Sequence, residues 1–299
     1  MAGISETLHL ASGPLTVELE PAIGGSVGAF RHGATALMRP LSAADRAVGN
    51  VLGVAMFPML PYANRITGNA FDFRGKSYGF AANNPPEPFN VHGTGWQRPW
   101  NLDRANATEA VLWLAVTDPD SAYTYRATQH FGLDPTGLTV AVTISNTGPD
   151  AMPFGFGLHP WFDRDADVTL QFNARTFYLE EPDNVAGDPV SIPAELDFAL
   201  PRRLPDRWRN NDYGGWDGVA ILRFPSRGIG LRILADPVFR HLMVYADPAK
   251  PYFCVEPQTN AAGAFNRKTG FDDPDEGILV LGPGESAQGA VRFEAFLIT

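Results

Sequence analysis

Residues 123–144 read YTYRATQHFGLDPTGLTVAVTI, and this stretch decides the fold class of the chain. Mostly apolar side chains recur at every second position over residues 123–131 and again over residues 138–144. Between the two runs, residues 132–137 contain the glycine, aspartate and proline typical of a tight turn. Alternation with a period of two indicates a strand that buries one face, so the stretch predicts an antiparallel hairpin.

The alternating pattern recurs along the chain. Residues 15–19 alternate between apolar and polar side chains. Residues 219–224 and 229–234 flank the turn sequence PSRG and predict a second hairpin. Residues 278–281 and 290–298 flank GPGE and predict a third. The chain is therefore expected to consist mainly of antiparallel strands.

Helix signals are few, and the best is residues 42–48, where Ser42 is a candidate N-cap. The chain has 30 glycines and 26 prolines, which suits many turns and few helices. Residues 184–211 are rich in proline, aspartate and arginine and are expected to form a long loop that crosses the fold. Since no linker or fixed-period repeat divides the sequence, we predict a single domain over residues 1–299, an all-β antiparallel sandwich or barrel.

The composition narrows the classes of function. Hydrophobic residues make up 44% of the 299 residues, enough for a large core, and the net charge is −10. No run of lysine and arginine occurs, so we expect no nucleic acid and no membrane among the partners. No segment has 18 consecutive apolar residues, and residues 1–7 lack the pattern of a signal peptide. With Cys254 as the single cysteine, we expect a cytoplasmic protein without disulfides.

The run FCVEPQT at residues 253–259 places Glu256 at the end of an apolar, strand-like segment. Pro257 follows at once and favours an extended backbone at Glu256. Removal from water raises the pKa of a carboxyl group, and this can turn a glutamate into a useful base. Glu256 is therefore a candidate catalytic residue, with a structural carboxylate as the alternative.

Two of the six histidines lie in sequences that suggest a ligand site. His92 is in FNVHGTGW, where nearby glycines let the backbone approach a ligand and Trp96 offers an apolar face. His159 is in GFGLHPWF and, like Glu256, ends an apolar segment before a proline. The remaining histidines are isolated and are expected to be structural or on the surface: His9, His32, His130 and His241.

Two further charged residues stand out. Arg65 follows the apolar stretch 54–60, and a guanidinium group there needs acceptors, either a buried carboxylate or substrate oxygens. Asp217 lies in GGWDGVA at the entry to an expected strand, where a turn residue is the simpler interpretation.

Five short motifs occur in order along the chain: Asn64-Arg65-Ile66, His92-Gly93, His159-Pro160-Trp161-Phe162, Asp217 and Glu256-Pro257-Gln258-Thr259. Together they resemble the aldose 1-epimerase (galactose mutarotase) family. The segment TGNAFDFRGKSY at residues 67–78 also resembles the hairpin that precedes the first histidine in that family. The resemblance covers nearly the whole chain and implies a large antiparallel β-supersandwich of the galactose mutarotase type, with few short helices.

The resemblance also implies a role for each matched residue. Glu256 corresponds to the general base and His159 to the general acid. His92 corresponds to a second histidine that binds the sugar near its ring oxygen. Arg65 and Asp217 correspond to side chains that hold sugar oxygens.

Further substrate contacts are expected around these motifs. We expect Asn64 and Trp161 to bind the sugar, Trp161 by packing against its C–H face. Asp212 lies close to Asp217 in the sequence, so either carboxylate is a candidate for holding hydroxyls. Leu158 and Trp161 replace residues that are frequent in the family, and this leaves the identity of the sugar open.

The activity implied by the resemblance is the interconversion of α and β anomers of a monosaccharide aldose, without a metal, nucleotide or redox cofactor. A base takes the proton of the C1 hydroxyl while an acid protonates the ring oxygen, the ring opens, the C1–C2 bond rotates, and the ring closes again. We expect neighbouring charges to keep Glu256 as a carboxylate and His159 as an imidazolium near neutral pH. The protein is expected to act as a monomer or homodimer.

Three other functions are alternatives. A sugar-phosphate epimerase of the same fold would need extra cations for the phosphate, and Arg98 and Lys268 are candidates. A glycoside hydrolase would use two carboxylates, such as Glu256 and Asp217. A non-catalytic carbohydrate-binding protein would bind sugar without chemistry. A metal hydrolase is not expected, since neither His-x-His nor His-Glu-x-x-His occurs in the sequence.

Overall fold

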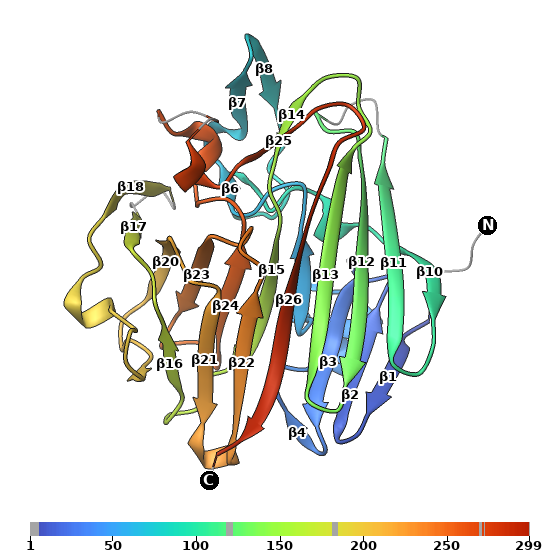
Figure 1. Ribbon diagram of the computed structural model, residues 1–299, viewed down its shortest axis with the longest axis vertical. Coiled ribbons are helices and arrows are strands. Elements are labelled where there is room, and N and C mark those ends of the chain that lie inside the picture. Colours follow the sequence, from blue (N-terminus) through green and yellow to red (C-terminus); the bar gives the residue numbers. More distant parts are fainter. Residues whose placement is uncertain (1–5, 118–121, 181–184, 269–270, 272, 299) are drawn as a thin grey trace.

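The structure, a computed structural model, describes residues 6–117, 122–180, 185–268, 271 and 273–298. Most of its elements are strands, and they form two large antiparallel sheets that pack face to face (Figure 1). The predicted all-β architecture is confirmed. No helix in these described ranges is long and apolar enough to cross a membrane.

The larger sheet has eleven strands. Their order across the sheet is β1 (Leu8–Ser12), β2 (Leu15–Glu20), β3 (Ser26–His32), β5 (Met56–Met59), β15 (Gly157–Asp163), β24 (Tyr252–Gln258), β23 (His241–Ala246), β20 (Arg209–Gly214), β17 (Thr176–Glu180) and β18 (Ala186–Val190). The eleventh strand, β4 (Thr35–Ala36), pairs with β3.

The second sheet has nine strands. Their order is β10 (Asn101–Ala105), β11 (Glu109–Val116), β12 (Tyr125–Asp134), β13 (Gly137–Asn146), β26 (Ser286–Leu297), β22 (Ile229–Ala235), β21 (Val219–Phe224), β16 (Thr169–Phe172) and β19 (Arg202–Arg203).

The remaining elements are short. Three two-stranded sheets pair β14 (Met152–Phe154) with β25 (Leu279–Leu281), β6 (Arg65–Ile66) with β9 (Asn90–Val91), and β7 (Ala70–Phe73) with β8 (Lys76–Gly79). The helical elements are α1 (Ala43–Ala47) and the 3₁₀ turns η1 (Val51–Gly53), η2 (Thr67–Asn69), η3 (Gly95–Gln97), η4 (Ala194–Leu196), η5 (Pro225–Arg227), η6 (Ala264–Asn266) and η7 (Pro274–Glu276).

Two of the three predicted hairpins are confirmed. Strands β12 and β13 pair with Leu133 opposite Leu138, and β21 pairs with β22. The third prediction is wrong, because β25 pairs with β14 while β26 lies between β13 and β22. The turn at residues 282–285 therefore carries the chain from one sheet to another instead of back along the same strand.

The predictions for irregular and helical segments had mixed outcomes. Residues 185–211 do not form one long loop, since they contain β18, η4, β19 and the start of β20; residue 184 lies outside the described ranges. Strand β18 pairs with β17 at the edge of the larger sheet. The predicted helix is confirmed as α1, and the Ser42 hydroxyl accepts a hydrogen bond of 3.0 Å from the Asp45 N–H.

The alternation of side chains along the strands sets the position of the functional residues. In β24, Phe253 and Val255 belong to the main core between the sheets. Because successive residues of a strand point to opposite faces, Cys254 and Glu256 point away from that core. A second, smaller apolar cluster, which includes Phe57 of β5, lies apart from the main core. The outer face of the larger sheet is thus partly covered, and the candidate site lies there.

Candidate active site

A hollow of about 180 Å³ opens over the middle of the larger sheet, and we call it the central hollow. It contains five of the seven predicted site residues, contributed by separate segments of the chain. Its lining consists of Arg65, Val91, His92, His159, Trp161, Trp208, Asn210, Met243, Tyr245 and Glu256.

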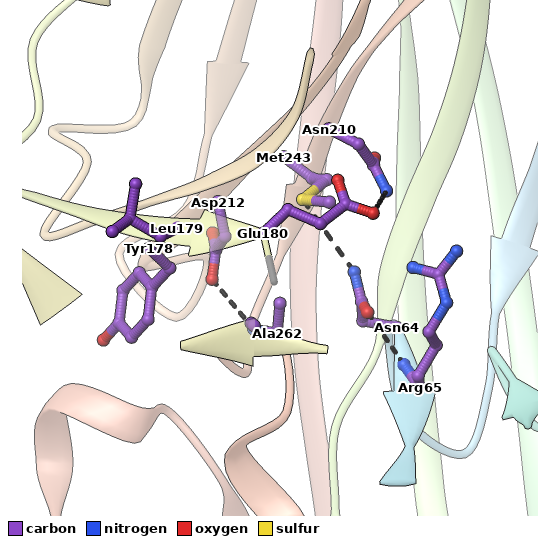
Figure 2. Close-up of a pocket in the computed structure, with 10 residues that line it drawn as sticks. Asn64, Arg65, Tyr178, Leu179, Glu180, Asn210, Asp212, Met243 and Ala262 are labelled. Carbon is purple, nitrogen blue, oxygen red and sulfur yellow. Dashed lines mark hydrogen bonds between the residues drawn. The ribbon is translucent and has the colours of Figure 1, made fainter. Parts of the chain in front are cut away.

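A second, narrower hollow lies beside the first and shares Arg65, Asn210 and Met243 with it (Figure 2). We call it the acidic hollow because two carboxylates lie on its wall. Its lining consists of Asn64, Arg65, Tyr178, Leu179, Glu180, Ala186, Asn210, Asp212, Met243 and Ala262.

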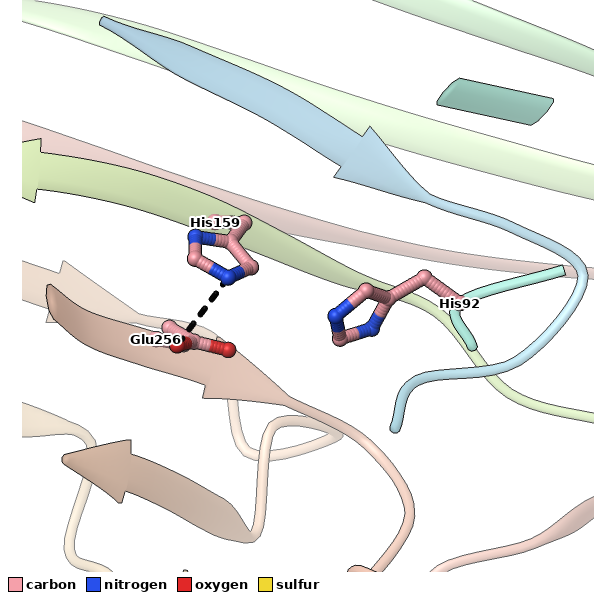
Figure 3. A group of neighbouring side chains, drawn as sticks. All are labelled: His92, His159 and Glu256. Carbon is pink, nitrogen blue, oxygen red and sulfur yellow. Dashed lines mark ion pairs between the residues drawn. The ribbon is translucent and has the colours of Figure 1, made fainter. Parts of the chain in front are cut away.

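His159 and Glu256 lie on neighbouring strands and contact each other (Figure 3). The register of β15 and β24 pairs Trp161 with Cys254, and by the same register position 159 falls opposite position 256. The His159 Nε2 atom lies 3.3 Å from Glu256 Oε1. Glu256 is 3% exposed and His159 8% exposed, so the pair forms the buried floor of the central hollow.

Two aromatic rings pack against the imidazole of His159. The centroid of Phe57 lies 4.5 Å from that of His159, and the centroid of Trp161 lies 4.8 Å from it, with the Trp161 and His159 rings nearly parallel. The guanidinium of Arg39 lies 4.4 Å from the centre of the Trp161 ring. This stack fixes the orientation of His159, and it places Trp161 behind the imidazole as well as in the lining of the hollow.

His92 occupies a backbone conformation that few side chains adopt, with a φ of 59°. Gly93 follows with a φ of 62°, and a Cβ atom there would overlap Pro61 and the carbonyl of Leu60. The Nδ1 atom of His92 accepts a 3.0 Å hydrogen bond from the backbone N–H of Asn64. In neutral His92 the hydrogen therefore lies on Nε2, which can donate to a ligand.

The hydrogen bond to His92 also bears on metal binding. His92, His159 and Glu256 each offer a ligand atom within 4.8 Å of the others. However, Nδ1 of His92 is already used by the Asn64 N–H, and Nε2 of the neutral ring then carries a hydrogen. A histidine that binds a metal instead donates its second N–H to an acceptor. This arrangement of His92 does not fit a metal ligand.

Arg65 lies at the junction of the two hollows and is paired with Glu87, which the sequence analysis missed. The Nη2 atom of Arg65 lies 2.9 Å from Glu87 Oε2, and both side chains are largely buried. Of the two acceptors expected for Arg65, the structure thus supplies a carboxylate. The role of Arg65 in holding sugar oxygens stays a prediction.

Asn64 lies on the wall of the acidic hollow and not of the central one. It has a φ of 64°, and its side-chain oxygen accepts a hydrogen bond from the Arg65 N–H. Its backbone N–H donates to His92. Asn64 therefore positions Arg65 and His92, and its contact with the sugar stays a prediction.

Asp217 lies away from both hollows. Its side chain is exposed, and its carboxylate accepts hydrogen bonds from the Val219 N–H and the Asn173 amide. These bonds fit the simpler interpretation of a turn residue. Asp212, the alternative carboxylate, is buried and lies on the wall of the acidic hollow.

Burial controls the protonation of the central pair. It raises the pKa of Glu256 well above its ordinary value, an effect opposed by Arg65 and reinforced by Asp212. It lowers the pKa of His159 to about 3. Both shifts favour the uncharged forms, because desolvation outweighs the neighbouring charges, and they therefore oppose the expected imidazolium and carboxylate. Desolvation thus favours a pair in which a neutral imidazole and a carboxyl group together hold one exchangeable proton.

The same cause acts on His92. Burial lowers its pKa well below the ordinary value, and the positive charges of a protonated His159 and of Arg65 act in the same direction. These effects favour the neutral ring of His92, which can donate from Nε2.

Besides Val91, which precedes His92, four residues of the central hollow were not identified from the sequence: Trp208, Asn210, Met243 and Tyr245. They come from β20, β23 and the segment just before β20. In the register of these strands, Met243 lies opposite Glu256 and Asn210 opposite Tyr245. The apolar run at residues 242–246 was a usable signal for a buried strand, but only the sheet order shows that β23 lies next to β24.

Comparison with known proteins bears on the whole chain. The family model described as aldose 1-epimerase matches residues 21–294. The uncharacterized protein YphB of Escherichia coli K12 is 32% identical over 271 residues, which covers 88% of this chain and 90% of that protein. A second uncharacterized protein of the same organism, YihR, is 28% identical over 106 residues, or 34% of each chain.

Solved structures agree with these matches. An E. coli K12 structure, provisionally described as an aldose 1-epimerase, superposes with a TM-score of 0.90 at 28% identity, covering 98% of this chain and 99% of the other. A galactose mutarotase-like protein from Clostridium acetobutylicum superposes with a TM-score of 0.85 at 18% identity, covering 98% and 95%, which supports the fold alone. The chain therefore belongs to the aldose 1-epimerase family.

Proposed function

We propose that this protein interconverts the α and β anomers of a free aldose by general acid/base catalysis. The observation that carries the proposal is the 3.3 Å contact between His159 Nε2 and Glu256 Oε1 at the floor of the central hollow. Anomerisation needs one group that gives a proton and one that takes a proton. A pair that shares one proton always supplies one of each.

The reaction can be written with all protons accounted for. The base member of the pair takes the proton of the C1 hydroxyl, and the acid member gives its proton to the ring oxygen O5. The C1–O5 bond breaks to give an open-chain aldehyde, the C1–C2 bond rotates, and O5 attacks the other face of C1. The two proton transfers then reverse, so the pair again holds one proton.

The assignment of roles is part of the proposal. Glu256 acts as base and His159 as acid after the resting proton moves from the carboxyl group to the imidazole. When the proton lies on the Glu256 carboxyl group, Glu256 is the acid and His159 is the base. Ring closure uses the pair in this order, by microscopic reversibility. His92 donates from Nε2 to a sugar oxygen and stabilises the charge that develops there.

The central hollow gives no specific support to a glycoside hydrolase. Such an enzyme uses two carboxylates across the scissile bond. Among the described residues that line the central hollow, Glu256 is the only carboxylate.

The test is to follow freshly dissolved α-glucose and α-galactose by polarimetry or by NMR. We expect the wild-type protein to accelerate the approach to the anomeric equilibrium while releasing no sugar from a nitrophenyl glycoside. Binding of these sugars without faster anomerisation would indicate a carbohydrate-binding protein. Release of nitrophenol would indicate a hydrolase. Either result would contradict the proposed function.

A further inference from the structure

The acidic hollow has room for one small group. Its cavity volume is about 10 Å³, close to the space that one water molecule needs. Because it shares Arg65, Asn210 and Met243 with the central hollow, a substituent of a ligand bound there can enter it. A hydroxyl group fits a space of this size, whereas a phosphate group is much larger.

Among the residues that line the acidic hollow, two buried acceptors and one buried donor, Arg65 Nε, lack a partner within the described part of the chain. Glu180 Oε2 and Asp212 Oδ1 are buried, and neither has a hydrogen-bond partner among the described residues. An ionised carboxylate only accepts hydrogen bonds, and a buried acceptor that stays unpaired costs free energy. A ligand that enters should therefore bring donors, as a hydroxyl does and a phosphate or carboxylate does not.

Glu180 is the less fixed of the two carboxylates. Asp212 Oδ2 contacts His241 and accepts from the backbone N–H of Ala262, so Asp212 is part of the framework. Within the described ranges, the hydrogen bond that holds the Glu180 carboxylate comes from the Asn210 amide, which donates to Oε1 over 3.2 Å. In Figure 2 its carboxylate lies beside that amide, on the side of the hollow where the Arg65 guanidinium ends.

The charges around Glu180 disfavour an anion. The Arg65 guanidinium is already paired with Glu87 at 2.9 Å. Burial raises the pKa of Glu180 to about 7, with Asn210 and Arg65 lowering it and Glu87 raising it. The charge of Arg65 is thus already offset by Glu87, and an anion in the hollow would face the Glu180 carboxylate without an unpaired cation among the described lining residues.

We propose that Glu180 is a specificity-determining residue that, with Asn210, binds a sugar hydroxyl remote from C1 and excludes substrates with an anionic substituent there. This inference rests on the proposed function and narrows it to neutral aldoses. Aldose phosphates and uronic acids are excluded by the size of the hollow and by its charge.

The experiment compares glucose with glucuronate and glucose 6-phosphate as substrates for anomerisation. Wild-type kcat/KM should be about 100-fold or more higher for glucose than for either anionic sugar. This is the size expected because the anion loses a charge-assisted hydrogen bond and stays unpaired in the hollow. Glu180→Gln keeps the shape of the side chain and removes its charge. It should raise KM for glucose by about tenfold and reduce the discrimination against both anions by about tenfold or more.

Two controls define the result. Glu109→Gln removes an exposed carboxylate of β11 and should behave like wild type. Asn210→Ala removes the bond that holds Glu180 and should raise KM for glucose, so it keeps the inference testable if Glu180→Gln fails to fold. Unchanged KM and unchanged discrimination in Glu180→Gln, or a wild-type preference for either anion, would overturn the inference.

Binding measurements separate this inference from the proposed function. Trp161 and Trp208 line the central hollow, so sugar binding can be followed by their fluorescence in a Glu256→Gln background. If glucose binds selectively and Glu180→Gln weakens that binding, the inference is supported. A wild-type protein that binds glucose in this way but anomerises no sugar would contradict only the proposed function. Equal binding of glucose and glucuronate with and without Glu180 would overturn the inference alone.

Discussion

Two histidine–carboxylate pairs are buried on the same face of the larger sheet, and their hydrogen bonding differs. In the first pair, His241 Nδ1 lies 3.1 Å from Asp212 Oδ2, and His241 Nε2 lies 2.9 Å from the carbonyl oxygen of Asp275. Both ring nitrogens thus face oxygen atoms of groups that the fold holds in place. The backbone N–H of Ala262 adds a third bond, to Asp212 Oδ2.

In the second pair, His159 and Glu256 bond chiefly to each other. The contact of 3.3 Å joins Nε2 to Oε1, and His159 Nδ1 has no hydrogen-bond partner within the described ranges. Residues of the central hollow surround the pair, whereas the His241 side chain is fully enclosed. The difference between the pairs suggests a rule. A buried histidine–carboxylate pair whose atoms are hydrogen-bonded to fixed backbone groups stabilises the fold, whereas a pair that lies beside a cavity and has an unpaired ring nitrogen can bind a substrate.

The largest expected effect is on activity and concerns the second pair. Glu256→Gln and His159→Phe should each reduce anomerisation by about 10²–10⁴-fold, the usual contribution of a positioned acid or base. The phenyl ring introduced by His159→Phe would keep the stacking with Phe57 and Trp161, so the fold should persist. The measurement is the initial rate of anomerisation with unfolding curves of both variants. Near-wild-type rates in both variants would contradict the proposal that His159 and Glu256, unlike His241 and Asp212, take part in catalysis.

The next effect is on stability and concerns the first pair. His241→Ala removes the partner of the buried Asp212 carboxylate, and breaking a buried pair in this way typically costs about 3–5 kcal/mol. Urea unfolding should show this loss, while His159→Phe should cost far less because it leaves no charge unpaired. If the two substitutions destabilise equally, the pairs do not differ in the way the bonding suggests.

The smallest effect is a dependence on pH. Because the pKa of Glu256 is raised in the folded state, folded protein keeps a proton that the unfolded chain loses above pH 4.5. The stability from this group is present below that pH and is lost as pH rises. Glu256→Gln should therefore gain about 1.4 kcal/mol per pH unit relative to wild type between pH 5 and the raised pKa.

His159 acts in the opposite direction and keeps its effect in the Glu256→Gln variant. Its folded-state pKa is lowered to about 3, so the unfolded chain binds a proton below pH 6.5 that the folded chain does not. Acidification should therefore destabilise Glu256→Gln more steeply than wild type. Urea unfolding at pH 5, 6, 7 and 8 measures the difference, with Glu109→Gln as the control. A difference that stays constant across this range would refute the protonation state assigned to the pair.

Much of the fold followed from local pattern. Alternation in residues 123–144 predicted the hairpin of β12 and β13, because both strands and their turn are adjacent in the sequence. The third hairpin failed because β26 finds its partners in β13 and β22, which are distant in the chain. Alternation in the sequence shows where strands form, but only tertiary packing decides which strands pair with each other.

The candidate site divides in the same way. His92, His159 and Glu256 were identified from their motifs, and the structure brings them together. Glu180 was not identified, since it is an ordinary residue at the end of β17 until the sheet order places it beside Asn210. Asp217 and Asp212 could not be separated by sequence, because their difference lies in burial and partners.

The sequence by itself determined where alternating strands form and which motifs carry the family resemblance. Both depend on residue types at short spacing, such as the proline after His159 and after Glu256. The tertiary structure alone decided the direction of the pKa shifts in the central pair and which buried histidine lies beside a cavity. These depend on desolvation and on hydrogen-bond partners from distant segments, which no local spacing encodes.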